Sequence, residues 1–135
     1  MKPESYLDEV RTWKGTPFRH KGLTKGLAVD CIGLVYGSAV AVGLVGGFLP
    51  DYAKSPQGTL LEQSLKSHPD VNEVNNLKPG DILLFKFAKF AQHVGIYTGR
   101  NLIHSYEPVG GYTEHRYCSK WENRRVAVFR FNSLA

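Results

Sequence analysis

Three side chains in this sequence are of the types that act together in nucleophilic thiol catalysis. Cys31 stands directly before a long apolar stretch, and His93 and His104 follow in the second half of the chain. A thiol attacks as its thiolate, and a helix N-terminus stabilises that anion through unpaired N–H groups and the helix dipole. A nearby imidazole can take the thiol proton and return it to a leaving amine, while a third polar group fixes the imidazole tautomer. Cys31, His93 and His104 are therefore candidates for the nucleophile, the base and the orienting residue.

The spacing of apolar residues predicts helices in the first half of the chain. Ser5 is expected to cap a first helix, and residues 18–29 show little periodicity and are predicted to form a loop. Cys31 opens a second helix that reaches about Leu44 and is apolar on nearly all sides, as a buried central helix is. A short helix is predicted over Thr59–Ser67. The predicted nucleophile therefore lies at the start of a helix.

The second half of the chain has the pattern of strands. The predicted strands cover residues 82–85, 94–97, 102–104, 112–116 and 126–131. Antiparallel pairing of residues 93–97 with 102–106 would bring two strands alongside each other, so that His93 and His104 could share a face of the sheet. Helices followed by antiparallel strands predict an α+β fold, with the helix of Cys31 packed against this sheet.

The composition is that of one globular domain spanning residues 1–135, with 42% hydrophobic and 21% charged residues. The net charge of +5 favours an anionic partner, such as a cell wall, a nucleic acid or a membrane surface. The basic residues are scattered, however, and only Arg124 and Arg125 are adjacent to each other. Nucleic-acid binding is not predicted, because the sequence has no basic stripe.

Neither export nor a membrane span is expected from this sequence. The N-terminus has no apolar signal-peptide core, so a Sec-type route is not predicted. Residues 31–49 form a stretch of 19 residues without a charge, which is the crude length of a spanning helix, but five of them are glycine. A buried helix in a soluble core is the preferred interpretation. Cys31 and Cys118 lie in different local contexts, and a free thiol is predicted at Cys31.

Five short motifs occur along the chain in a recognisable order. They are Gly15-Thr16-Pro17-Phe18-Arg19, Asp30-Cys31-Ile32-Gly33-Leu34-Val35, Leu77-Lys78-Pro79-Gly80-Asp81-Ile82-Leu83-Leu84-Phe85, His93-Val94-Gly95-Ile96-Tyr97 and Ile103-His104-Ser105. Together they resemble the NlpC-type family of papain-like cell-wall cysteine peptidases. Each motif alone is weak, but five in the right order over about 90 residues make the resemblance specific.

The resemblance implies a fold, a reaction and a set of roles. The implied fold is papain-like, with the nucleophile helix packed on a C-terminal antiparallel sheet. Cys31 would be the nucleophile, His93 the general base and acid, and His104 the orienting residue, with the backbone N–H of Cys31 contributing to an oxyanion hole. The implied reaction is hydrolysis of amide bonds in bacterial peptidoglycan stem peptides, commonly between D-glutamate and diaminopimelate, without a metal or cofactor.

The sequence departs from the family pattern at two positions near the nucleophile. Phe18 stands where the family usually has tyrosine, so a hydroxyl often placed near the oxyanion is missing, and His20 or Tyr36 is a candidate to replace it. Ile32 stands where serine usually follows the nucleophile. Asp30 precedes the thiol and is expected to cap its helix. Phe18, His20, Asp30 and Tyr36 are the predicted substrate-binding residues.

The chain carries no wall-binding repeat, and with the absent signal it most resembles the tail-associated peptidases of bacteriophages. Such a protein is made in the host cytoplasm and carried to the wall by the virion. The expected location is therefore the phage tail. The expected partners are peptidoglycan stem peptides and tail-tip or hub proteins, with no nucleic acid and no membrane span.

Three alternatives stay open from the sequence. The first is a structural tail-tip or hub subunit with little or no catalysis, which the departures at Phe18 and Ile32 motivate. The second keeps the same three residues for an amidase or acyl-transfer reaction. The third is a zinc site, although its possible ligands lack the compact spacing of known zinc motifs. These ligands would be His93, His104, His115 and Cys118. The segment 44–76 carries no motif.

Overall fold

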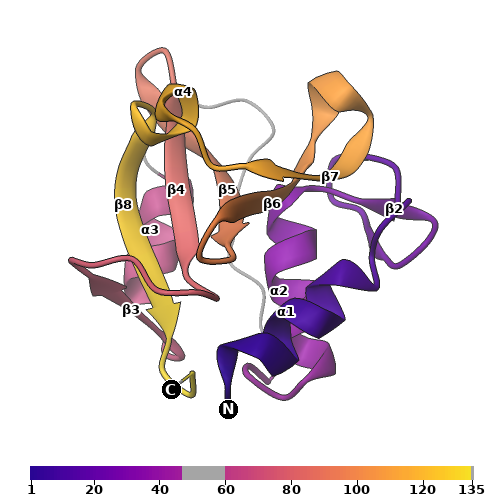
Figure 1. Cartoon of the computed structure of the whole chain (residues 1–135), viewed down its shortest axis with the longest axis horizontal. Helices are drawn as coiled ribbons and strands as arrows, with labels where there is room; N and C mark the ends of the chain where they lie inside the picture. The colour runs from indigo at the N-terminus through magenta and orange to yellow at the C-terminus, as the bar shows by residue number, and fades with distance from the viewer. Residues whose placement is uncertain (47–59, 135) are drawn as a thin grey trace.

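The computed structural model describes residues 1–46 and 60–134, which form helices followed by an antiparallel sheet (Figure 1). The helices are α1 (Pro3–Arg11), α2 (Cys31–Ala41), α3 (Leu60–Ser67), the 3-10 helix η1 (Glu107–Val109) and α4 (Ser119–Glu122). The strands are β1 (Leu23–Thr24), β2 (Ala28–Val29), β3 (Val71–Val74), β4 (Ile82–Phe87), β5 (Phe90–Tyr97), β6 (Asn101–Tyr106), β7 (Gly111–Arg116) and β8 (Arg125–Phe131). Six strands form one sheet in the order β3-β8-β4-β5-β6-β7, and β1 pairs with β2 alone. The predicted α+β class is confirmed.

Apolar clusters cover both faces of the six-stranded sheet. Along β4, Ile82 and Leu84 belong to one cluster while Leu83 and Phe85 belong to the other, because successive residues of a strand point to opposite faces. The larger one, here the helix-side cluster, includes the buried residues of α1, α2 and α3. The smaller one, here the aromatic cluster, consists of Leu83, Phe85, Leu102, Trp121 and Val128 with the half-buried Val74, Leu77, Phe87, Tyr97, Tyr106 and Tyr117.

Helix α1 begins earlier than the sequence predicted. Pro3 occupies its first turn, where the missing N–H of proline leaves no bond unmade and its fixed φ suits the helix. Lys2 holds the cap position without a side-chain bond. Ser5 lies inside the first turn, and its backbone N–H donates to the carbonyl oxygen of Lys2 at 3.1 Å. The predicted cap at Ser5 is therefore wrong.

Helix α2 is the buried central helix that the sequence predicted. Seven of its 11 residues are buried. It ends at Ala41, short of the predicted Leu44, and Gly43 follows in the left-handed conformation with φ +80°. Such a glycine ends a helical path at little steric cost. Helix α3 begins within the described residues at Leu60, whereas Thr59 of the predicted helix lies outside them.

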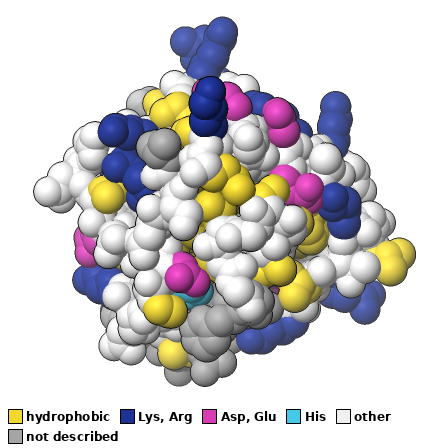
Figure 2. All heavy atoms as spheres, turned by 90° about the horizontal axis from the view of Figure 1, so that it is seen from below, with side chains coloured by type: hydrophobic (Ala, Val, Ile, Leu, Met, Phe, Trp, Pro, Cys, Tyr) yellow, Lys and Arg dark blue, Asp and Glu magenta, His cyan; other side chains and the backbone are white. Residues whose placement is uncertain are grey.

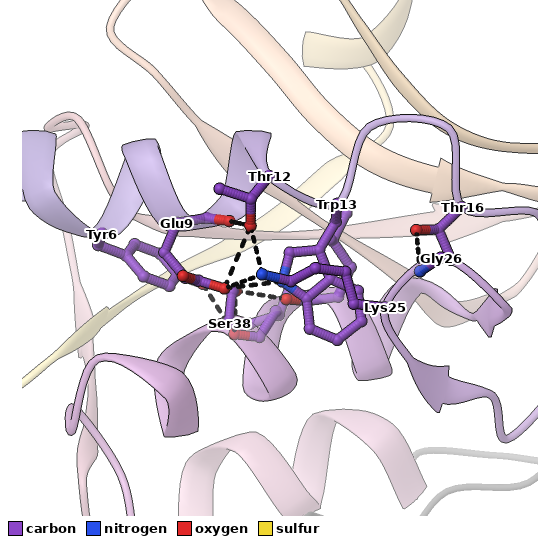
Figure 3. A network of polar contacts seen from close by, with 10 residues as sticks. Tyr6, Glu9, Thr12, Trp13, Thr16, Lys25, Gly26 and Ser38 are labelled. Atoms are coloured by element: carbon purple, nitrogen blue, oxygen red, sulfur yellow. Dashed lines mark hydrogen bonds and ion pairs between the residues drawn. The ribbon is translucent and has the colours of Figure 1, made fainter.

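The hairpin of β1 and β2 lies within residues 18–29, which were predicted to be a loop. Figure 3 shows how it is joined to α1 and to the residues that follow α1. Between the two strands, the Lys25 ammonium donates to the Glu9 carboxylate at 2.9 Å and to the Thr12 hydroxyl at 2.6 Å. The next residue, Gly26, donates its N–H to the Thr16 hydroxyl at 2.9 Å. These bonds fix the hairpin, which leads directly into α2.

A buried ion pair joins the start of β4 to β8. Asp81 is fully buried and accepts two bonds from the Arg130 guanidinium, at 2.7 Å from Nε and 2.8 Å from Nη2. The backbone N–H of Lys78 donates a third, at 2.8 Å. A bidentate pair with further hydrogen bonds is the arrangement in which the attraction of two charges offsets their desolvation. It anchors the turn that leads into β4.

The surface carries its positive charge in scattered positions. On the face seen from below in Figure 2, Lys and Arg side chains surround an apolar centre and form no continuous stripe. Within residues 1–46 and 60–134, no helix has the length and apolar character needed to cross a membrane.

Candidate active site

Cys31 is the first residue of α2, and the helix begins there because Asp30 caps it. Asp30 has extended backbone, and its Oδ1 accepts the backbone N–H of Gly33 at 2.7 Å. The predicted cap is therefore confirmed. The free thiol of Cys31 lies at the end of the helix where unpaired N–H groups and the dipole favour negative charge.

The second oxygen of the Asp30 carboxylate holds the loop that precedes α2. Its Oδ2 accepts the backbone N–H of Lys21 at 2.8 Å and lies 4.0 Å from Nδ1 of His20. Gly33 packs so closely on this loop that a Cβ there would overlap the carbonyl oxygen of Gly22. The loop carrying His20 and the helix carrying the thiol are thus joined through one buried carboxylate.

The two histidines come together because β5 and β6 pair as antiparallel neighbours, as the sequence predicted, in a register that the sequence left open. Ile96 lies opposite Ile103. Continuing this register places Gly95 opposite His104 and on the same face as His93. Nε2 of His93 lies 2.7 Å from Nδ1 of His104. The prediction that both histidines share a face is confirmed.

Gly95 leaves the space in which the two imidazoles meet. A Cβ at this position would lie 2.5 Å from Cδ1 of Leu102 and 3.3 Å from Cβ of His104. A larger residue would therefore displace the Leu102 side chain and crowd His104. This close packing explains why a glycine occupies the third position of the His-Val-Gly-Ile-Tyr motif.

Aromatic rings of the aromatic cluster hold both imidazoles in place. The Trp121 ring centroid lies 4.8 Å from that of His104 and 5.9 Å from that of His93. Tyr106 stacks on His104 with centroids 5.1 Å apart and an interplanar angle of 19°. Rings packed on several sides lose rotameric freedom, so the two imidazoles keep one orientation.

Cys31 and His93 line the same cleft, which has a volume of about 340 Å³. Cys31 packs against the helix-side cluster, whereas His93 contacts rings of the aromatic cluster. The cleft therefore brings together groups from the two faces of the sheet. These groups meet past the point where the hydrogen-bonded pairing of β5 with β6 ends. The other lining residues are Phe18, His20, Asp30, Phe87, Gln92, Ser105, Tyr106, Glu107, Pro108 and Arg124.

Burial favours the neutral forms of the nucleophile and the base. It raises the pKa of the Cys31 thiol to about 12, an effect that backbone N–H groups of Val94 and Ile32 oppose. It lowers the pKa of His93 to about 3, and the positive charge of Arg124 adds to this shift. Both shifts favour a transfer of the thiol proton to His93 as the thiol attacks, which is the pattern of general-base catalysis.

Three of the four predicted substrate-binding residues line the cleft. They are Phe18, His20 and Asp30. Tyr36 does not reach the cleft, because it is fully buried in the helix-side cluster and its ring stacks on His68 at 5.2 Å. The prediction that Tyr36 binds substrate is therefore wrong, because this residue lies in the core. Of the two candidates to replace the hydroxyl missing at Phe18, His20 alone is in place.

Arg124 is a cleft residue that the sequence analysis noted only as one of the scattered basic residues. Its Cζ lies 5.0 Å from the Trp121 ring and 5.1 Å from the Phe87 ring. Its Nη1 is buried and has no hydrogen-bond partner among residues 1–46 and 60–134. The only local signal was its position directly before the last strand. Its place in the cleft depends on the pairing of β8 with β4, which the sequence alone did not give.

The alternative zinc site is not formed. Within residues 1–46 and 60–134, no group of three or more His, Cys, Asp or Glu side chains is arranged to hold a metal ion. Cys118 is exposed at the start of α4 and does not line the cleft.

Comparisons with known proteins agree with this geometry. The model of the NlpC/P60 family matches residues 15–130. Among curated proteins, a probable endopeptidase NlpC of Escherichia coli K12 is 32% identical over 127 residues, which are 88% of this chain and 75% of that protein. The murein DD-endopeptidase MepS/murein LD-carboxypeptidase of the same organism is 30% identical over 96 residues, which are 70% of this chain and 44% of that protein.

A solved structure has the same fold. The crystal structure of the NlpC/p60 domain of the peptidoglycan hydrolase SagA matches with a TM-score of 0.66 and 18% identity, over 95% of this chain and 97% of that one. The match thus covers nearly all of that domain, whereas this chain spans less than half the length of the MepS relative. The papain-like α+β fold that the motifs implied is confirmed.

Proposed function

The chain belongs to the NlpC/P60 family of cysteine-type peptidoglycan endopeptidases, and from this premise we propose that it hydrolyses amide bonds in the stem peptides of bacterial peptidoglycan. One observation carries the proposal. Cys31 lies at the capped N-terminus of α2, in one cleft with His93, which is hydrogen-bonded to His104.

In the proposed reaction, the Cys31 sulfur attacks the carbonyl carbon of the scissile amide while its proton passes to His93. The carbonyl oxygen takes up the negative charge, and in this proposal the backbone N–H of Cys31 donates to it. His93 then gives its proton to the leaving amine as the C–N bond breaks. Water, deprotonated by His93, hydrolyses the thioester and restores the thiol. His104 holds the His93 ring throughout.

We propose the D-glutamyl–diaminopimelate bond as the bond that is cleaved. When D-glutamate is linked through its side chain, its free α-carboxylate lies close to the scissile amide. Arg124 supports this choice, because its guanidinium lines the cleft and its Nη1 has no hydrogen-bond partner in the described part of the chain. A buried guanidinium nitrogen is stabilised by a carboxylate, with which it forms a charge-assisted hydrogen bond. The name of the MepS relative refers to other bonds of the stem peptide, so the test must identify the bond.

The first test is mass spectrometry of muropeptides incubated with three proteins: wild type, Cys31→Ala and Cys118→Ala. Cys118→Ala is the matched control, because Cys118 is also a free thiol but is exposed and outside the cleft. New products are expected from the wild type and from Cys118→Ala, and none from Cys31→Ala. Product masses identify the bond. A product formed by Cys31→Ala, or none formed by folded and reduced wild type, contradicts the proposal.

A second test addresses the carboxylate. Arg124→Gln should raise KM for a stem peptide whose D-glutamate has a free α-carboxylate, and should leave KM unchanged for the peptide in which that carboxylate is amidated. Loss of one charge-assisted hydrogen bond corresponds to about 10-fold or more in KM. Arg100→Gln is the control, since Arg100 is exposed and outside the cleft. Equal effects on both peptides would contradict the role of Arg124.

We also propose a phage tail as the setting of this activity, on the motif resemblance alone. The test is the presence of the protein in purified particles, and its absence from them would overturn this setting.

The alternative of a structural subunit without catalysis rested on Phe18 and Ile32. Ile32 is fully buried in the helix-side cluster and removes no group from the cleft, so only Phe18 still supports it. Full infectivity of a phage carrying Cys31→Ala would favour that alternative.

A further inference from the structure

The contact between His93 and His104 continues to a third imidazole. His115 lies on β7, opposite Leu102 of β6, and is half-buried. Its Nε2 lies 2.9 Å from Nε2 of His104, and its Nδ1 lies 2.9 Å from the carbonyl oxygen of Arg116. Three rings and one carbonyl are thus hydrogen-bonded in series, from the cleft to the outer strand of the sheet.

The carbonyl at the end of the series determines where each proton lies. A carbonyl oxygen only accepts, so Nδ1 of His115 carries a proton and, in the neutral ring, Nε2 of His115 is an acceptor. His104 must then donate from Nε2, which leaves its Nδ1 as an acceptor. His93 must donate from Nε2, which leaves its Nδ1 unprotonated. Burial supports neutral rings, because it lowers the pKa of His93 to about 3 and that of His104 to about 2.

We propose that His115 is a positioning residue: acting through His104, it holds His93 in the tautomer whose Nδ1 can accept the Cys31 proton. This inference rests on the proposed peptidase function. A ring that turned over would place carbon atoms where its nitrogens now bond and would lose these hydrogen bonds. Trp121 packs on all three rings, with centroid distances of 4.8 Å to His104 and 5.9 Å to each of the others. Packing fixes the ring orientations, and the hydrogen bonds fix the protons.

Without an acceptor at position 115 the proton arrangement is no longer unique. In His115→Phe, Nε2–H of His104 has no partner on this side, so His104 can carry its proton on Nδ1 instead. That proton points at Nε2 of His93 and forces His93 to hold its own proton on Nδ1. In this state His93 cannot accept from the thiol.

Kinetics should show a loss in the chemical step alone. For His115→Phe, kcat on muropeptides should fall about 10- to 100-fold, the usual effect of removing an outer partner of a catalytic imidazole. KM should stay unchanged, because His115 is not among the residues that line the cleft. His115→Gln keeps an acceptor for His104 and a donor for the Arg116 carbonyl, so it should recover most of kcat. Glu114→Gln is the control on the same strand, since the Glu114 carboxylate bonds to Arg11 and lies outside the series.

The deciding measurement is ¹⁵N NMR of the imidazole nitrogens in the folded protein without substrate. Wild type and Glu114→Gln should show His93 protonated on Nε2 and unprotonated on Nδ1. His115→Phe should show mixed tautomers at His93 and His104, and His115→Gln should restore the wild-type pattern. A wild-type His93 protonated on Nδ1, or unchanged tautomers in His115→Phe, would overturn the inference whatever the activity. The expected tautomers in a protein that cleaves no muropeptide would instead overturn the proposed function, and the kinetic role of His115 with it.

Discussion

Replacing Asp30 should show how much its side chain contributes to the stability of the fold, apart from the chemistry of the neighbouring Cys31. Asp30 is buried, with one oxygen bonded to the N–H of Gly33 and the other to the N–H of Lys21, at 2.7 and 2.8 Å. Loss of a helix cap costs about 1 kcal/mol, and loss of a hydrogen bond to a charged group costs about 1.5 to 3 kcal/mol. Asp30→Ala should therefore lower the free energy of unfolding by about 2.5 to 4 kcal/mol, a large part of the about 5 to 15 kcal/mol of an ordinary domain.

Asp30→Asn should remove one of the two hydrogen bonds of this carboxylate and keep the other. Its side-chain oxygen can still accept from Gly33, whereas its amide group meets the N–H of Lys21 as a second donor. The expected loss is about 1.5 to 3 kcal/mol, since only the cap survives. Asp8→Ala is the matched control, because Asp8 is an exposed carboxylate on α1, and surface changes of this kind stay within about 0.5 kcal/mol.

The first assay is urea unfolding at pH 7, in which the unfolding midpoints of the variants are compared at equal slope. The second is muropeptide cleavage, measured without urea at a temperature where every variant is folded. Cleavage should fall in both Asp30 variants, because the loop beside the cleft is no longer held to α2. An Asp30→Ala variant as stable as Asp8→Ala would refute the reasoning that this carboxylate joins loop and helix.

Three further predictions concern the rest of the structure. Asp81→Ala should lower the free energy of unfolding by about 3 to 5 kcal/mol, because it leaves the Arg130 guanidinium without its partner; a loss below 1 kcal/mol in urea would show that the pair contributes little. Tyr36→Phe should raise stability by about 1 kcal/mol with unchanged cleavage, since its buried hydroxyl has no hydrogen-bond partner among the residues that the structure describes, and a lower melting temperature would contradict this. Burial lowers the pKa of His93 from 6.5 to about 3 and that of His104 from 6.5 to about 2. At a pH between the lowered pKa and 6.5, the unfolded chain therefore binds more protons than the folded one. Stability should be full above pH 6.5 and fall as the pH decreases toward 3, by up to about 1.4 kcal/mol per pH unit for each imidazole, and urea midpoints independent of pH from 7 to 4 would refute it.

The features predicted well from the sequence are those that local patterns determine. The cap at Asp30 follows from a carboxylate three residues before the N–H that it accepts. The antiparallel pairing of β5 and β6 follows from the short turn between them, whereas the register that places His93 and His104 on one face is known from the structure alone. The strand order, in contrast, depends on contacts between distant segments. β3 pairs with β8, about 60 residues away, and no local pattern indicated this.

The features that the sequence did not predict share this physical cause. The cap at Ser5 failed because a proline two residues earlier was already a good helix start. The polar hairpin in residues 18–29 is held by contacts with α1 that periodicity does not reveal. His115 and Arg124 reach the site only after β7 and β8 join the sheet, so their roles were visible in the structure alone.

The cleft wall at Phe18 is held almost entirely by its main chain. Phe18 donates its N–H to the carbonyl oxygen of Gly110 at 2.8 Å, and the carbonyl oxygen of Pro17 accepts the N–H of Val29 at 2.9 Å. Neither bond uses the side chain of Phe18. This position is therefore suited to a mutant library that alters selectivity, because new side chains can be installed there while the backbone hydrogen bonds of the wall are kept.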